Sequence, residues 1–590
     1  MNFIILLVFF AIVLFIVTTL LLTWVGEDGH KASEKRKPRF VSFLLYIFVG
    51  IFFLLSMRSA LIGVRMITWF YFFAFVELLC LYFSSYSTVK SQITPIFIIT
   101  VLAITQSLMP IIQNKGIIFG PDQWRDLEVT TYIVEKGTFE DYPWIAPGFY
   151  SFIPLFNILN AVISKVLGFP PMLTIGTMQA FFCLISVLSV YIIMKKLFDN
   201  SMISLLAAIL LISTPRLAII QSLPSTASLS LGLLLLLSFI KGSVVFSRSL
   251  IGIIVLLALV AAIIHPIGIL IALVAASSFL LCNYLYTKNL VTQRITFMKN
   301  AFVVCLITSL ACWVWKNEIF KSVFNPLLRF LRSFATLRKS SLLYYPQYQS
   351  AGFEIFSFAW ALPVAFSAAF VLTNFIKSWR KKNEINFNLP LQIITASTIA
   401  GLGLILSAFL SVLISPGAAV ERYVSTIGYA LLILPTSVVF GRFLFSKKKI
   451  ALLFAIILLS ANIIIASRSP DLAPFENPTF GAVRYTFTGF TEAITIVNFL
   501  PNNTYLYEDH DIPLASVGNL KGSAFITYRS YQPTRVVIQS FKDNSFKPFH
   551  SKYKNAFIAI KTDEIADQKL FYNFVNIIYS SENHVMVDPL

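Results

Sequence analysis

The chain has 590 residues, of which 57% are hydrophobic and only 12% charged, and its mean hydropathy is +0.79. No globular core of this size hides so much apolar surface, so the composition excludes a soluble protein and predicts a polytopic α-helical membrane protein. The formal net charge of +19 does not indicate nucleic acid, because Lys and Arg fall in short clusters between apolar runs, as the signals that orient membrane helices do.

Apolar runs of membrane-spanning length predict about fourteen transmembrane helices. The predicted spans are residues 3–23, 41–57, 66–84, 94–112, 172–194, 202–220, 225–240, 249–264, 267–286, 300–316, 355–376, 391–414, 423–441 and 449–466. The connections rich in Lys and Arg all fall on one side, which the positive-inside rule assigns to the cytoplasm. The outer side of a plasma membrane therefore receives the long connections 113–171 and 317–354 and everything after residue 467.

We divide the chain into N-terminal transmembrane helices (1–93), a transmembrane core (94–467) and a C-terminal region (468–590). In the last region the apolar runs shorten to strand length and are separated by Pro, Gly, Asn and Asp. The clearest of these runs are residues 504–507, 535–539 and 556–560. The pattern predicts a small extracytoplasmic α/β domain.

An acidic segment in the first outer connection contains Asp122, Arg125, Asp126 and Glu128. After Pro121 it is predicted to be helical, with one apolar stripe formed by Trp124, Leu127, Thr131 and Val134. Asp122 and Asp126 are four residues apart and would share a face, whereas Glu128 would point elsewhere. Two carboxylates so placed repel each other, which suits a general base or a divalent-metal site for Mg²⁺ or Mn²⁺. A helix cap at Asp122 with a solvated Asp126 explains the same residues equally well.

The segment that follows is rich in aromatic residues and proline. It runs from Gly137 through residues 142–150 to Phe152 and Phe156. Such a stretch is typical of a segment that lies along the membrane interface, with its rings at the depth of the headgroups. An acidic helix followed by an interfacial helix would make a site between water and lipid.

The order of these features resembles the GT-C superfamily of membrane glycosyltransferases. These enzymes take sugars from polyprenyl-phosphate carriers, and they include protein O-mannosyltransferases, lipid A aminoarabinose transferases and the catalytic subunit of oligosaccharyltransferase. The matching residues are 122–126, 132–133, Gly137 and 142–150. The resemblance covers roughly residues 94–440 and implies that Asp122 is the catalytic base. Gln123 departs from the family's common Asp-Glu pair, so Asp126 or Glu128 would supply a second acid.

The resemblance implies an inverting glycosyltransferase of the hexosyl or mannosyl type, with its active site on the outer face. Its partners would be a sugar on a polyprenyl phosphate such as dolichyl phosphate, membrane lipids, and a glycan, protein or lipid acceptor of the cell envelope. Arg422 and Tyr423 resemble the family's Arg-Tyr pairs near the lipid phosphate, although an interfacial anchor also explains them. His265, at a predicted outer turn, would bind phosphate or sugar, or simply mark a helix break. Arg125 and Arg216 are further candidates for substrate binding.

Two other classes of function fit a basic polytopic chain. The first is a transporter or flippase for lipid-linked glycans, which needs charged or broken helices near the bilayer midplane; Glu77 is the clearest acid deep within a predicted span. The second is a non-catalytic membrane protein of envelope assembly that binds a partner through residues 468–590.

Overall fold

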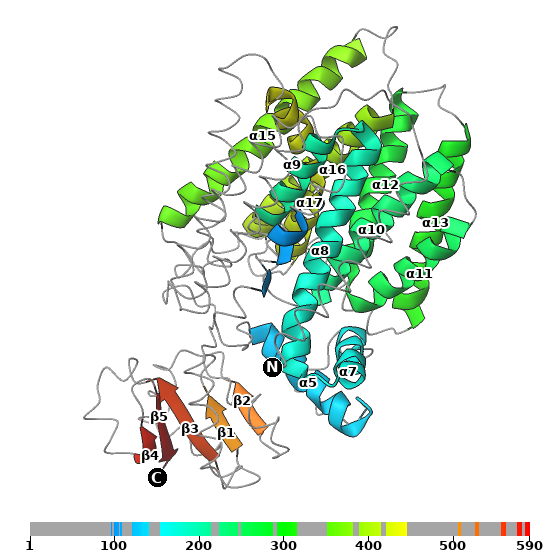
Figure 1. Cartoon of the computed structure of the whole chain (residues 1–590). Coiled ribbons are helices and arrows are strands. Elements are labelled where there is room, and N and C mark those ends of the chain that lie inside the picture. The colour runs from blue at the N-terminus through cyan, green and yellow to red at the C-terminus, as the bar shows by residue number, and fades with distance from the viewer. Residues whose placement is uncertain are drawn as a thin grey trace, which may run out of the picture. The chain divides into compact units, whose positions relative to one another are not determined.

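The structure is a computed structural model, and it contains two compact units (Figure 1). It describes Ile96 and residues 99–104, 107–108, 121–140, 154–213, 224–245, 249–286, 292–315, 351–380, 389–414, 420–444, 505–508, 526–529, 556–561, 575–580 and 584–589. One unit holds the helices from Thr177 of α8 to α17, and the other holds α5, α7 from Asn157 onward, and the strands.

The helices are long and mostly apolar. They are α5 (Pro121–Lys136), α7 (Leu155–Leu167), α8 (Pro171–Phe198), α9 (Ser201–Ser213), α10 (Pro224–Val245), α11 (Ser249–Ile264), α12 (Pro266–Tyr286), α13 (Thr292–Trp315), α15 (Ala351–Arg380), α16 (Leu389–Ile414) and α17 (Val420–Leu444). Several begin at a proline, whose fixed φ and missing N–H suit the first helical position. Each predicted span from 172–194 to 423–441 overlaps one of these helices, and residues 214–220 of the predicted span 202–220 lie outside the described residues. The predicted spans 3–23, 41–57, 66–84 and 449–466 lie outside the described residues.

Four helices of the described part are long and apolar enough to cross a membrane. They lie in Pro171–Phe198, Pro224–Gly242, Ile295–Val314 and Pro390–Ser407, and shorter apolar helices accompany them. Some apolar side chains of α11 and α13 remain exposed, such as Leu256 (60%) and Ile307 (60%). These helices therefore have outer faces that suit lipid.

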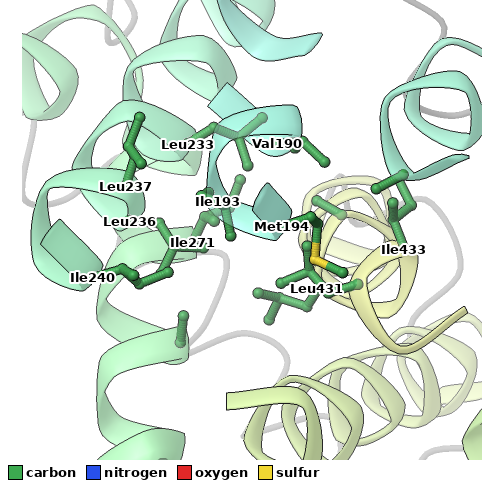
Figure 2. Close-up of a cluster of buried hydrophobic side chains, with 14 of the residues drawn as sticks. Val190, Ile193, Met194, Leu233, Leu236, Leu237, Ile240, Ile271, Leu431 and Ile433 are labelled. Carbon is green, nitrogen blue, oxygen red and sulfur yellow. The ribbon is translucent and has the colours of Figure 1, made fainter. Parts of the chain in front are cut away.

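The interior of the bundle is packed with aliphatic side chains. Figure 2 shows Val190, Ile193 and Met194 of α8 between leucine side chains of α10 and Leu431 and Ile433 of α17. All of these are buried, so the bundle holds together by close contact of branched side chains. In Figure 1, α8, α10 and α12 run side by side through this unit.

Glycines allow α10 and α12 to approach each other closely. A Cβ atom built on Gly268 of α12 would lie 1.9 Å from the carbonyl oxygen of Ser228 in α10, and one built on Gly232 would lie 2.3 Å from the carbonyl oxygen of Gly268. No side chain larger than hydrogen fits at either position without moving the backbones. Small residues at such crossings are a common way for membrane helices to pack.

The strands near the C-terminus form a five-stranded mixed sheet in the order β2-β1-β3-β5-β4. Their bounds are β1 (Tyr505–Glu508), β2 (Ile526–Arg529), β3 (Ala556–Lys561), β4 (Val575–Ser580) and β5 (His584–Pro589). β1 pairs in parallel with β2 and β3, and β5 pairs antiparallel with β3 and β4. The predicted strands 504–507 and 556–560 coincide with β1 and β3, while the predicted strand 535–539 lies outside the described residues.

Candidate functional site

The acidic segment forms the helix that the sequence predicts. α5 begins at Pro121 and ends before Gly137, whose φ of +76° is left-handed. The N–H of Gly137 donates to the carbonyl oxygen of Ile133 at 2.9 Å, which closes the last turn. Asp122, Arg125, Asp126 and Glu128 therefore share one helix, with Asp122 in its first turn and Asp126 one turn later.

The buried face of α5 differs from the predicted apolar stripe. Leu127 is buried as expected, but Thr131 and Val134 are only half-buried. The buried positions instead include Gln123, Asp126 and Thr130, with exposures of 1%, 2% and 0%. The physical reason is that α7 offers polar groups to this face, so polar side chains can be buried with hydrogen-bond partners.

The partner helix α7 is turned with its polar side inward. Asn157, Asn160 and Ser164 are buried, whereas Val162 and Val166 are 52% and 76% exposed. α7 ends before Gly168, whose φ of +66° allows the N–H of Phe169 to donate to the carbonyl oxygen of Ser164 at 3.1 Å. Its exposed apolar side suits the predicted interfacial helix. The aromatic stretch 142–150 that precedes α7 lies outside the described residues.

Asn157 joins the two helices. Its Nδ2 lies 2.9 Å from the carbonyl oxygen of Asp126, 3.5 Å from Oδ1 of the same residue and 3.4 Å from Oγ1 of Thr130. The Thr130 hydroxyl donates to the same carbonyl oxygen at 2.7 Å. The main chain at Asp126 thus accepts two side-chain hydrogen bonds, and one of them comes from another helix.

Neither Asn157 nor Thr130 was predicted as a site residue from the sequence. A signal was present, because Asn157, Asn160 and Ser164 recur at helical spacing on one side of α7 while valines occupy the other. The pattern was hidden by the aromatic stretch that precedes it. Glu128, which was predicted to point elsewhere, is half-buried.

His265 lies between α11 and α12, outside both apolar helices, and is 3% exposed. The N–H of Ile267 donates to its Nδ1 at 3.2 Å, so the imidazole caps α12, and its carbonyl oxygen accepts from the Ser228 hydroxyl. Burial lowers the pKa of His265 from 6.5 to about 3, so the ring is neutral at physiological pH. This geometry accounts for His265 as a helix break; a role in binding phosphate or sugar stays a prediction.

The remaining predicted residues are placed less fully. Arg422 and Tyr423 lie in the first turn of α17, and Arg216 lies outside the described residues, as do residues 317–350 of the second outer connection. Within the described ranges, no group of three or more His, Cys, Asp or Glu residues is arranged to hold a metal ion. A metal held by Asp122 and Asp126 stays a prediction.

Comparisons with protein-family models and with curated protein sequences find no match. Among solved structures, ArnT from Cupriavidus metallidurans in the apo state matches with a TM-score of 0.50 and 12% identity over 85% of this chain and 98% of that one. ArnT bound to undecaprenyl phosphate gives a TM-score of 0.49 and 12% identity over 84% and 98%. The arabinofuranosyltransferase AftD from Mycobacteria gives 0.44 and 11% over 79% and 35%.

The likeness to apo ArnT establishes the fold. The chain has a polytopic helical membrane fold like that of ArnT, and it matches nearly the whole of ArnT. The fold that the resemblance implied is therefore confirmed.

Proposed function

We propose that this chain is a membrane glycosyltransferase that moves a sugar from a polyprenyl-phosphate carrier to an acceptor on the outer face of the membrane. The observation that carries the proposal is the fold match over 98% of ArnT, a GT-C transferase. ArnT has been observed with undecaprenyl phosphate bound, which supports a polyprenyl phosphate as the carrier. The acidic helix α5 supports the same class of reaction, because it brings carboxylates to a segment beside a helix with an exposed apolar side.

In the proposed reaction Asp122 acts as the general base. Its carboxylate takes the proton of an acceptor hydroxyl while the acceptor oxygen attacks the anomeric carbon. The bond between that carbon and the phosphate oxygen breaks, and its electron pair leaves on the phosphate. The products are an inverted glycosidic bond and free polyprenyl phosphate. Phosphate is a good leaving group, so the reaction as written needs no general acid.

Arg422 is proposed to hold the phosphate. A guanidinium can make two parallel hydrogen bonds to phosphate oxygens, which stabilises the charge that grows on the leaving group. Tyr423 and Arg125 are each proposed as further substrate-binding residues, and Asp126 as the second acidic residue of the site. We route no step through a metal ion; if a chelator abolishes transfer and Mg²⁺ or Mn²⁺ restores it, Asp122 and Asp126 become the ligands to test.

The test compares Asp122→Asn with Glu135→Gln, because Glu135 lies on the same helix and is exposed. In a strain lacking the gene, the envelope glycan should lose one sugar, detected by mass spectrometry, and the corresponding polyprenyl-phosphate sugar should accumulate. We expect the wild-type gene and Glu135→Gln to restore the glycan, and Asp122→Asn, expressed at the same level, to fail. Full restoration by Asp122→Asn would remove Asp122 from the mechanism.

The same strain separates the rival functions. A flippase would leave the carrier-linked sugar on the cytoplasmic side, where membrane-impermeant periodate cannot oxidise it in sealed spheroplasts. A transferase leaves that sugar on the outer side, unused. An assembly protein would change neither the carrier-linked pool nor its side.

A further inference from the structure

A hydrogen bond from Asn157 to the main chain of Asp126 ties α7 to α5, one helical turn from the proposed base, Asp122. Asn157, at 1% exposure, places its amide nitrogen 2.9 Å from the carbonyl oxygen of Asp126, whereas the Asp126 carboxylate oxygen is more distant at 3.5 Å. The shortest of these Asn157 contacts therefore holds the main chain of α5 and not a side chain. A main-chain anchor fixes where a helical turn lies, independently of the residue's own rotamer.

The chemistry of the neighbours determines which end of the amide faces α5. The Asp126 carbonyl oxygen can only accept, and the Thr130 hydroxyl uses its proton on that same oxygen at 2.7 Å. Both neighbours thus present lone pairs to Asn157, and only an N–H group suits them. An oxygen in place of Nδ2 would face other oxygens in a buried setting, which is unfavourable.

We propose that Asn157 is a positioning residue for the transfer reaction, which holds the first turns of α5, and with them Asp122, through its amide on the Asp126 carbonyl. The inference rests on the proposed role of Asp122 as base. In an α-helix the N–H of residue i+4 donates to the carbonyl oxygen of residue i, so Asp126, whose carbonyl Asn157 holds, is also the residue whose N–H closes the turn that begins at Asp122. Asp122 stands one residue from the start of α5, where helices fray, and an anchor one turn further on limits that movement.

The first measurement is the rate of transfer by the full chain in lipid nanodiscs. The donor is the labelled polyprenyl-phosphate sugar that accumulates in the deletion strain, and the acceptor is that strain's envelope fraction. A misplacement of about 1 Å at a reacting group costs on the order of 100-fold in rate. We expect Asn157→Ala to lower kcat about 10-fold to 100-fold with KM for the donor unchanged, and Asn157→Asp, which keeps the size but presents an oxygen, to lower it at least as much.

Ser164 provides the matched control. It is also polar and buried on α7, but its hydroxyl donates to the carbonyl oxygen of Phe169 at 2.5 Å, at the end of its own helix. Ser164→Ala removes one buried hydrogen bond without touching that anchor, and its kcat should stay within about twofold of the wild type. Equal losses of kcat in Asn157→Ala and Ser164→Ala would overturn the positioning role. Thr130→Val allows a double-mutant cycle with Asn157→Ala. Because the two side chains share one acceptor, the loss of kcat in the double variant should be smaller than the product of the two single losses.

The second measurement needs no turnover. Amide hydrogen exchange in α5 should speed up about 10-fold in Asn157→Ala and be unchanged in Ser164→Ala. If amide exchange in α5 is the same in both variants, Asn157 does not hold α5 in place. The inference then fails, whatever the transfer rates of the variants are. If exchange speeds up but Asp122→Asn transfers sugar normally, the tie stands while the proposed function of Asp122 fails, and with it the positioning role.

Discussion

The α5–α7 pair buries a larger share of polar side chains than the interior of the helix bundle does. In the bundle, branched aliphatic side chains of α8, α10 and α17 fill the space between the helices (Figure 2). In the pair, the buried side carries Gln123, Asp126 and Asn157, while Val162 and Val166 face outward. Apolar packing is non-directional, whereas hydrogen bonds fix distance and angle.

The two regions therefore depend on different kinds of interaction. A bundle stabilised by apolar packing tolerates exchange of one aliphatic residue for another of similar volume. A pair held by a few buried hydrogen bonds loses its geometry when one donor is removed, because the acceptor left behind is buried without water. The part of the chain with the acidic residues is thus the part whose geometry depends on single side chains.

The largest expected effect tests whether close packing of the helices stabilises the bundle. Gly268→Ala should destabilise the protein by about 3 kcal/mol, because its Cβ would lie 1.9 Å from the Ser228 carbonyl oxygen and force α10 and α12 apart. The free energy of unfolding is measured by SDS titration in mixed micelles. The control is Gly252→Ala in α11, where a Cβ meets nothing within 4 Å; it should be neutral or stabilise by up to about 1 kcal/mol. Similar losses in both variants would mean that close approach at Gly268 is not what stabilises the crossing.

A second effect concerns a polar junction inside the bundle unit. Because burial lowers the pKa of His265 to about 3, the unfolded chain binds a proton below pH 6.5 that the folded chain does not. Stability should therefore fall as the pH drops from 6.5 towards 3, by about 1.4 kcal/mol per pH unit. His265→Asn keeps an acceptor for the Ile267 N–H but does not titrate. Between pH 6.5 and 5 the wild type should lose about 2 kcal/mol more than this variant.

Unfolding in SDS at several pH values measures this difference. Carboxylates elsewhere contribute equally to both proteins, so the difference between them reports His265 alone. Parallel curves for the wild type and His265→Asn would show that the imidazole is protonated or hydrated in the folded protein.

The sequence predicts the bundle well because a membrane span depends on the length and composition of one segment. The predicted span 391–414 and the observed α16 (Leu389–Ile414) differ only at the start. The helix after Pro121 was also predicted, from apolar residues that recur at helical spacing. Both are local properties, which need no knowledge of a partner.

The orientation of α5 could not be obtained in this way. Hydrophobicity alone favours Leu127, Thr131 and Val134 as the inner stripe, yet Asp126 and Thr130 are buried because Asn157, some 30 residues later, supplies donors to them. Which polar residues meet is a tertiary property. The role of Asp122 came from the family resemblance, and it stays a proposal.

The smallest expected effect tests whether polar pairs matter less in the bundle than in the α5–α7 pair. The Ser230 hydroxyl lies 2.8 Å from the Ser186 hydroxyl and 2.8 Å from the carbonyl oxygen of Phe182, and so links α10 to α8. Hydrogen bonds between membrane helices contribute about 0.6 kcal/mol on average, because apolar packing keeps the helices together without them. We expect Ser230→Ala to cost about that much, and the exposed Ser277→Ala to cost nothing measurable. If Ser230→Ala destabilised the protein as much as Asn157→Ala, hydrogen bonds would determine the bundle too, and the contrast between the two regions would disappear.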